Sequence, residues 1–132
     1  MMKFNALIPE LSVTDFKKSL HFYLDIGFRI RYERPERDFA FIQLEGNQIM
    51  LEKYNGNWET AKPEYPFGRG MNISMSVKSV GAIHKRAADC GYPIFRGIED
   101  YEYRMDNKML YGKEFLILDP DGWLLRFTES YE

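Results

Sequence analysis

The chain has 132 residues, enough for one compact domain or for two intimate modules that share a core, and 45% of its residues are hydrophobic. Its 18 basic and 20 acidic residues give a net charge of −2, which disfavours a general nucleic-acid-binding protein because such proteins carry a basic excess. No apolar run of about 18 residues is present, the N-terminal segment becomes polar too soon for a secretory signal, and the single cysteine cannot form an intramolecular disulfide, so we expect a cytoplasmic protein without a membrane span.

The first half of the chain predicts a strand, a helix and three further strands. A mixed pattern favours a strand over residues 4–13, after which Thr14 or Asp15 caps a helix that runs to about Ile26 and stops at Gly27. A strand follows over 28–33, then a polar turn. The alternating segments 39–44 and 49–54 predict a hairpin around Glu45-Gly46-Asn47-Gln48.

The second half follows a Gly- and Pro-rich segment over 55–70, the expected joint between modules. It predicts a strand over 72–77, a helix that Ser79 caps and Gly91 ends, with Cys90 expected to be buried near its end, and a strand near 93–96. After the segment 97–112, a last hairpin of 114–118 and 123–128 turns on Asp119-Pro120-Asp121-Gly122.

The two halves repeat one pattern of strand, helix and strands. Residues 13–28 align with 77–92 at a spacing of 64, and residues 44–53 align with 118–127 at a spacing of 74. The change of register indicates an insertion of ten residues in the second copy. We therefore predict an α+β domain of two modules, about 1–58 and 70–132, whose sheets form a central cleft.

Strand alternation sorts the side chains between two faces of the sheets. The residues expected to pack beneath the helices are Ile42, Leu44, Ile49, Leu51, Ile73, Met75, Val77, Leu116, Leu118, Leu125 and Phe127. The residues expected on the other face are Ile8, Glu10, Phe39, Phe41, Gln43, Met50, Glu52, Tyr54, Asn72, Ser74, Ser76 and Arg126. The second set mixes polar and aromatic groups, which is typical of a cleft that contacts a ligand.

These residues resemble a known family. The pattern Val13, Asp15, Ser19, Phe22 and Tyr23, with the final D-P-D-G turn, is similar to the vicinal oxygen chelate superfamily, which includes glyoxalase I, extradiol dioxygenases, and fosfomycin- and bleomycin-resistance proteins. The ending 111–127 is most similar to the bleomycin-resistance branch. Pro9 also fits that branch, whose dimers exchange the N-terminal strand. The resemblance implies two βαβββ modules that form a curved sheet around a cleft, and a homodimer.

The resemblance also implies four metal-ligand positions, which fall on Ile8, Glu52, Asn72 and Arg126. Only Glu52 is a usual ligand, because an isoleucine offers no lone pair and an arginine is a permanent cation. We therefore predict no metal and no other cofactor. The two histidines lie within the predicted helices and are expected to be structural, and no catalytic residue is assigned.

In bleomycin-resistance proteins a flat, cationic glycopeptide lies between aromatic side chains in grooves at the dimer interface. Aromatic rings suit such a role because they offer a large rigid surface at low entropic cost. The residues predicted to bind the ligand are Tyr32, Phe39, Phe41, Glu52, Tyr54, Trp58, Asn72, Tyr101, Tyr103 and Arg126.

Several of these residues have a structural alternative. Phe41 fits core packing, and Trp58 fits either a dimer contact or local packing. The acidic stretch 99–103 fits an exposed flap or an edge strand that its charges keep soluble. Glu52 and Arg126 occupy equivalent repeat positions, and we favour a buried ion pair between them over direct contact with a ligand.

The function that follows is a metal-free protein that binds and sequesters a small molecule, with a bleomycin-type antibiotic as one candidate. The alternative is a glyoxalase-like lyase or isomerase, or a dioxygenase, with unusual active-site residues, in which Glu52 serves as a base. A third option is a dimeric domain that has lost its ligand. A protein that binds the cationic bleomycin should carry marked negative charge. Since the net charge is only −2 and basic residues gather in the second module, the sequence supports membership of the bleomycin-resistance branch better than it supports bleomycin as the ligand. No nucleic-acid or membrane partner is expected.

Overall fold

The computed structural model describes residues 2–131, which form two four-stranded mixed sheets and two long helices. In the first module β1 runs parallel to β4, the remaining neighbours are antiparallel, and the strand order is β1-β4-β3-β2. Its elements are β1 (Glu10–Val13), α1 (Phe16–Ile26), β2 (Arg29–Arg34), a 3-10 turn (Pro35–Arg37), β3 (Phe39–Leu44) and β4 (Asn47–Lys53).

The second module repeats this arrangement with the strand order β5-β8-β7-β6 and a parallel pair between β5 and β8. Its elements are β5 (Ile73–Ser76), α2 (Val80–Asp89), β6 (Ile94–Met105), β7 (Lys108–Leu118) and β8 (Leu124–Tyr131). Each sheet thus has the strand order expected of one βαβββ unit, so the predicted α+β class and the internal repeat are confirmed.

The helices begin where the sequence predicts. The Asp15 carboxylate accepts a hydrogen bond from the Lys18 amide at 3.2 Å, and the Ser79 hydroxyl accepts one from the Ala82 amide at 3.1 Å. The prediction for the first strand was wrong at its start, because β1 begins only at Glu10. Residues 3–5 instead bind the far end of the sheet, where Gln48 bonds the backbone of Lys3 and Asn5.

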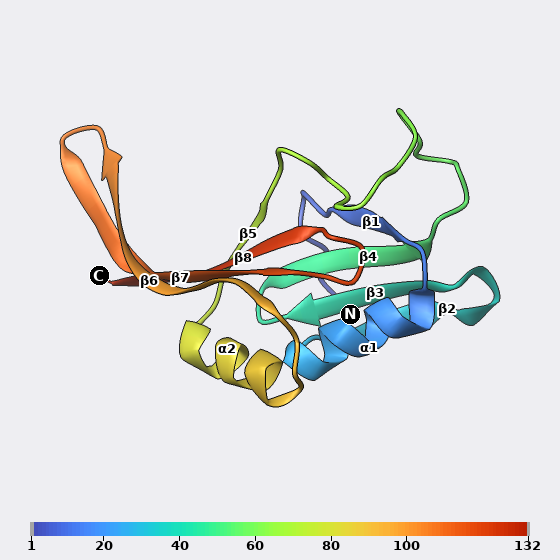
Figure 1. Cartoon of the computed structure of the whole chain (residues 1–132), viewed down its shortest axis with the longest axis horizontal. Helices are drawn as coiled ribbons and strands as arrows, with labels where there is room; N and C mark the ends of the chain where they lie inside the picture. The colour runs from blue at the N-terminus through green and yellow to red at the C-terminus, as the bar shows by residue number, and fades with distance from the viewer. Residues whose placement is uncertain (1, 132) are drawn as a thin grey trace.

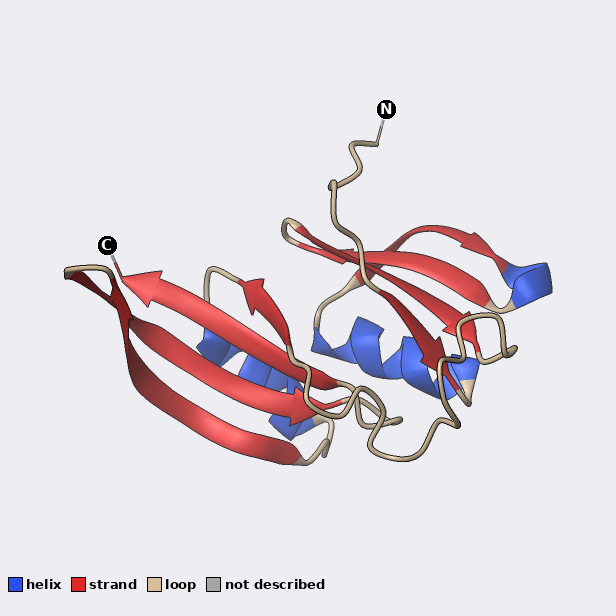
Figure 2. Cartoon of the chain, turned by 90° about the horizontal axis from the view of Figure 1, so that it is seen from above, coloured by secondary structure: helices blue, strands red, loops and turns tan. Residues whose placement is uncertain are grey.

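Both helices lie on one side of the strands, below them in Figure 1, and Figure 2 shows the two sheets side by side. One core joins the two modules and includes most of the residues predicted to pack beneath the helices. The assignment of β7 was wrong by one residue. Phe115 and Ile117 belong to this core, whereas Leu116 and Leu118 lie on the other face with Arg126.

The insertion lengthens β6 and β7 into a hairpin arm that projects from the body, at the upper left of Figure 1. β6 is an edge strand with exposed Glu99, Asp100 and Glu102, so the edge-strand interpretation of this stretch is confirmed. Cys90 is exposed, contrary to the sequence prediction. Helix α2 ends at Asp89, and the turn at Gly91 (φ 78°) leaves the thiol in solvent.

The D-P-D-G turn holds the two modules together. The Tyr23 hydroxyl of α1 donates to the Asp119 carboxylate at 2.7 Å, and the Thr14 amide and hydroxyl donate to Asp121 at 2.9 and 2.6 Å. Gly122 (φ 91°) has no room for a side chain, since a Cβ there would lie 2.5 Å from Pro66. Among residues 2–131 no helix is long and apolar enough to span a membrane.

Candidate ligand-binding site

The ten residues predicted to bind a ligand form three separate groups, with Asn72 apart from all of them. One group lies on the open face of the second sheet, the face turned away from the helices, and contains Arg126 with two tyrosines. A second lies on the corresponding face of the first sheet. The third lies under the loop between the modules. The structure therefore brings the predicted residues together within each group and not into one pocket.

The group on the second sheet is held by charged hydrogen bonds. The Arg126 side chain lies 3.2 Å from the Glu114 carboxylate through both Nε and Nη2, and the Tyr103 hydroxyl donates to the same carboxylate at 3.0 Å. The Arg126 guanidinium also lies over the Tyr103 ring, 5.2 Å from its centroid. Burial raises the pKa of the Tyr103 hydroxyl, and its bond to Glu114 adds to the rise, so Tyr103 remains a neutral donor.

Tyr101 extends this surface along the arm. Its ring stacks on Tyr103 with centroids 4.8 Å apart and an angle of 27°. Gly112 makes this possible, because a Cβ there would lie 2.5 Å from the Tyr101 ring. In the sequence, Tyr101 and Tyr103 are related only by their spacing of two residues, which places them on the same face of a strand. The structure adds a reason for their orientation, since residues 101 and 103 share a strand face with Glu114.

The predicted ion pair between Glu52 and Arg126 is not formed. Arg126 pairs with Glu114, two residues from its cross-strand neighbour Leu116, and the Glu52 carboxylate instead accepts from the Asn55 amide at 3.1 Å. The two half-sites therefore lie on different sheets without direct contact. Burial raises the pKa of Glu10, and the negative charge of the nearby Glu52 adds to the rise, while Arg34 opposes it.

The open face of the first sheet carries an aromatic cluster. Tyr32 stacks on Phe41 with centroids 5.0 Å apart, and Phe39 lies 5.9 Å from Tyr32. Phe4 packs edge-on against Phe41 at 5.5 Å and covers it. Phe39 and Phe41 are fully buried, so the structure favours the packing role considered for Phe41 and leaves Tyr32 and Phe4 at the surface.

The third group lines a cavity of about 500 Å³ between the inter-module loop and β1. Tyr54 and Trp58 lie there with Glu10 and Ser12, and the Tyr54 hydroxyl donates to Glu59 at 2.6 Å. Asn72 lines a smaller hollow of about 260 Å³ with Pro9 and Ser74. Neither His21, which contacts Asp25, nor His84, which packs on Phe115, approaches these groups.

The four positions that hold metals in the resembling enzymes do not fit a metal here. Ile8 has no donor atom, and the Arg126 cation is already neutralised by Glu114. Within residues 2–131 no three His, Cys, Asp or Glu side chains gather as ligands. We therefore derive no chemistry through a metal at this site.

Two contributors to these groups were missed by the sequence analysis. The sequence predicts Phe4 within a strand, but it lies before β1, and its packing on Phe41 depends on the bonds that hold residues 3–5 to Gln48. Glu114 was placed only as the first residue of a strand. A signal was present, because a lone carboxylate beside the apolar run 115–118 marks the even-numbered positions as the polar face.

The comparison with protein families settles the membership of the chain. The model of the Glyoxalase/Bleomycin resistance protein/Dioxygenase superfamily matches residues 5–127. The chain belongs to this superfamily. No curated protein matches the sequence well enough to be considered a relative.

Several solved structures share the fold. TioX from Micromonospora sp. ML1 superposes with a TM-score of 0.72 at 20% identity, covering 97% of this chain and 100% of that one. A bleomycin resistance determinant encoded on the transposon Tn5 gives 0.67 at 17%, covering 98% and 100%. A bleomycin-binding protein complexed with bleomycin gives 0.64 at 17%, covering 97% and 100%. At these identities the likeness shows the fold alone.

Proposed function

We propose that this superfamily member is a metal-free binding protein that sequesters a flat aromatic, cationic molecule on the open faces of its sheets, with a bleomycin-type antibiotic as one candidate. The observation that carries the proposal is the cluster of Tyr101, Tyr103, Glu114 and Arg126. In this cluster Arg126, at one of the positions that hold metal ligands in the resembling enzymes, is paired with Glu114. The rings of Tyr103 and Tyr101 lie beside that ion pair. Such a surface suits recognition by stacking and not Lewis-acid chemistry.

The first sheet supports the cationic character of the ligand. Arg34 already lies over the Phe39 ring, 4.4 Å from its centroid, so these rings accept a positive charge on their faces. Glu52 is the cross-strand neighbour of Phe39, and Glu10 lies on the adjacent strand β1. Carboxylates beside aromatic rings attract a planar cation through charge and stacking together.

We also propose a homodimer. Each open face carries some of the predicted residues and each sheet has an exposed edge, which a partner would cover. Exposed apolar side chains gather on the arm, at Tyr103, Met105, Met109, Leu110 and Tyr111. A second copy that covers these surfaces would place the two half-sites of different chains opposite one another.

Binding of bleomycin, with ethidium as a smaller planar cation, tests the function by calorimetric titration. At least one of the two is expected to bind, and Tyr103→Ala is expected to weaken that binding about tenfold, the order of one lost stacking and cation–π contact. Tyr111→Ala is the matched control, because Tyr111 is similarly exposed (46% against 42%) on the opposite face of the same arm. No binding of either cation, or equal losses in both variants, would contradict the proposal.

Native mass spectrometry of protein expressed in metal-supplemented medium tests the two other parts of the proposal, the homodimer and the absence of a bound metal. The expected species has twice the mass of the 15.7 kDa chain and no bound transition metal. One metal per chain that Glu52→Ala removes would favour the enzymatic alternative. A monomer at micromolar concentration would refute the dimer.

A further inference from the structure

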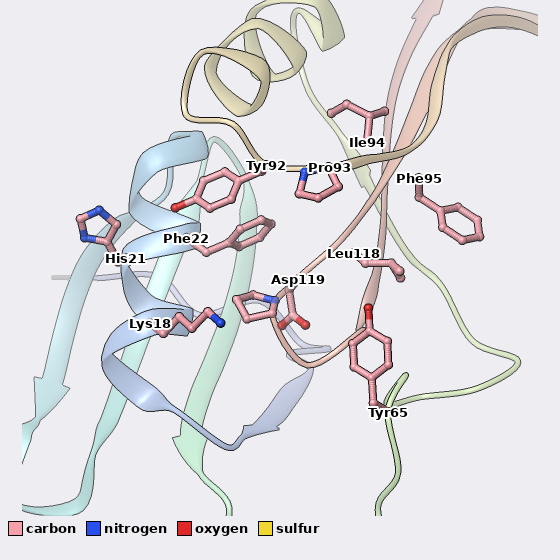
Figure 3. A pocket seen from close by; sticks show the side chains of 11 residues that line it. Lys18, His21, Phe22, Tyr65, Tyr92, Pro93, Ile94, Phe95, Leu118 and Asp119 are labelled. Atoms are coloured by element: carbon pink, nitrogen blue, oxygen red, sulfur yellow. The ribbon is translucent and has the colours of Figure 1, made fainter.

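A second cavity lies away from the ten predicted residues. It has a volume of about 570 Å³ and lies where α1, the connection from α2 to β6, the D-P-D-G turn and the inter-module loop meet (Figure 3). This volume is within the range of about 300–1,000 Å³ that small-molecule sites occupy. None of its lining residues belongs to the three groups described above.

The outer walls of the cavity are two exposed aromatic residues that the fold holds in place. Phe95 lies at a β-bulge, where the pairing of β6 with β7 shifts between Ile94 and Arg96, and bulges redirect the side chains they contain. Tyr65 precedes Pro66, which lies against Gly122, and the next amide, that of Phe67, donates to Asp121 at 2.9 Å. Both residues line the cavity, and Figure 3 shows Tyr65 below Leu118 and Phe95 to its right.

The inner walls are apolar and rigid. Phe22 packs edge-on against Tyr92 with centroids 4.8 Å apart, and Leu118 with Pro93 completes the surface. Leu118 is one of the residues that the sequence placed beneath the helices and that the structure turns to the other face. Its position here gives this cavity an aliphatic wall opposite α1.

One uncompensated charge borders the cavity. Lys18 forms no ion pair or side-chain hydrogen bond with any other residue among 2–131. The nearby Asp25 is occupied, since it accepts from the Tyr92 hydroxyl and contacts His21. The Asp119 carboxylate is buried and occupied by Tyr23 and two backbone amides. The ammonium of Lys18 is thus a free charge at a mainly apolar site, where Asp119 and His21 already have partners.

We propose that this cavity binds a small aromatic monoanion, with its apolar body against Phe95, Tyr92 and Leu118 and its acid group at Lys18. The site is independent of the proposed function, because the ligand has the opposite charge and contacts different residues. A chain with two such sites would bind a cation on its open sheet faces and an anion at this flank.

Fluorescence titration with 8-anilinonaphthalene-1-sulfonate tests the site, with the uncharged N-phenyl-1-naphthylamine as the paired probe. The sulfonate is expected to bind at one site per chain. Phe95→Ala is expected to weaken both probes about tenfold through the lost ring contact. Lys18→Met keeps the alkyl chain and is expected to weaken only the anion, by about fivefold at low salt.

Two control variants locate the binding. Lys17→Met makes the same charge change one residue away, outside the cavity, and Phe4→Ala removes an equally exposed ring (55% against 54%) from the first sheet. Both should leave the affinity for the sulfonate unchanged. Equal effects of the two lysine variants, or a loss in Phe4→Ala and not in Phe95→Ala, would overturn the proposal. Binding of bleomycin or ethidium should be unaffected by Lys18→Met, so this test and that of the proposed function fail separately.

Discussion

Replacing Arg126 by Met is expected to lower the free energy of unfolding by about 2 kcal/mol, because it leaves the Glu114 carboxylate without its cation in a nearly dry position. The side chain of Glu114 is 11% exposed and that of Arg126 is 26% exposed. The loss should therefore fall below the roughly 3–5 kcal/mol of a fully buried pair. Tyr103, which still donates to Glu114, reduces it further.

Adding Glu114→Gln to Arg126→Met should recover most of this loss, since the unpaired charge is removed with little change of shape. Denaturant unfolding of the wild type, both single variants and the double variant gives the coupling free energy. Glu52→Gln with Arg126→Met is the control cycle and is expected to be additive. Coupling in the Glu52 cycle and additivity in the Glu114 cycle would mean that Arg126 pairs across the modules and not within the second sheet.

The fold could be predicted because its signals are local and repeated. Helix caps at Asp15 and Ser79, the stop at Gly27 and the D-P-D-G turn each specify a backbone conformation through a few neighbouring atoms. The spacing of 64 residues between the two copies then fixes the order of strands in both sheets. These signals do not depend on how the sheets are placed relative to one another.

The site could be predicted only in parts, because its geometry depends on that placement. The equivalent repeat positions of Glu52 and Arg126 predicted that these two side chains meet. Arg126 instead pairs with Glu114 on the adjacent strand β7, because a residue on a neighbouring strand lies closer than its counterpart in the other module. The continuous apolar run 115–118 shows no alternation of its own, and the face of β7 was indicated only by the flanking Glu114. The lining of the cavity beside Lys18 comes from four separate segments of the chain, so no single sequence pattern predicted it.

The Asp119 carboxyl is expected to make the wild type lose stability as the pH rises from 4 to 7. Burial raises the pKa of Asp119 from its usual 3.8 to about 6, against the lowering effect of hydrogen bonds from Tyr23 and two backbone amides. Because the folded-state pKa exceeds the unfolded one, the stability from this proton is fully present below pH 3.8 and is lost as the pH rises through 6. A difference of about two pKa units corresponds to roughly 3 kcal/mol.

Asp119→Asn isolates this contribution, since the amide oxygen still accepts from the backbone amides of Asp121 and Trp123 and carries no charge. The unfolding free energy of the wild type minus that of Asp119→Asn should fall by up to about 3 kcal/mol between pH 4 and 7. Asp89→Asn, an exposed carboxyl paired with Lys85, serves as the matched control for the loss of one charge. A difference that stays constant or rises with pH would show that water or a cation stabilises the Asp119 carboxylate. The turn that joins the two modules would then be held by a charged group and not by a protonated one at acidic pH.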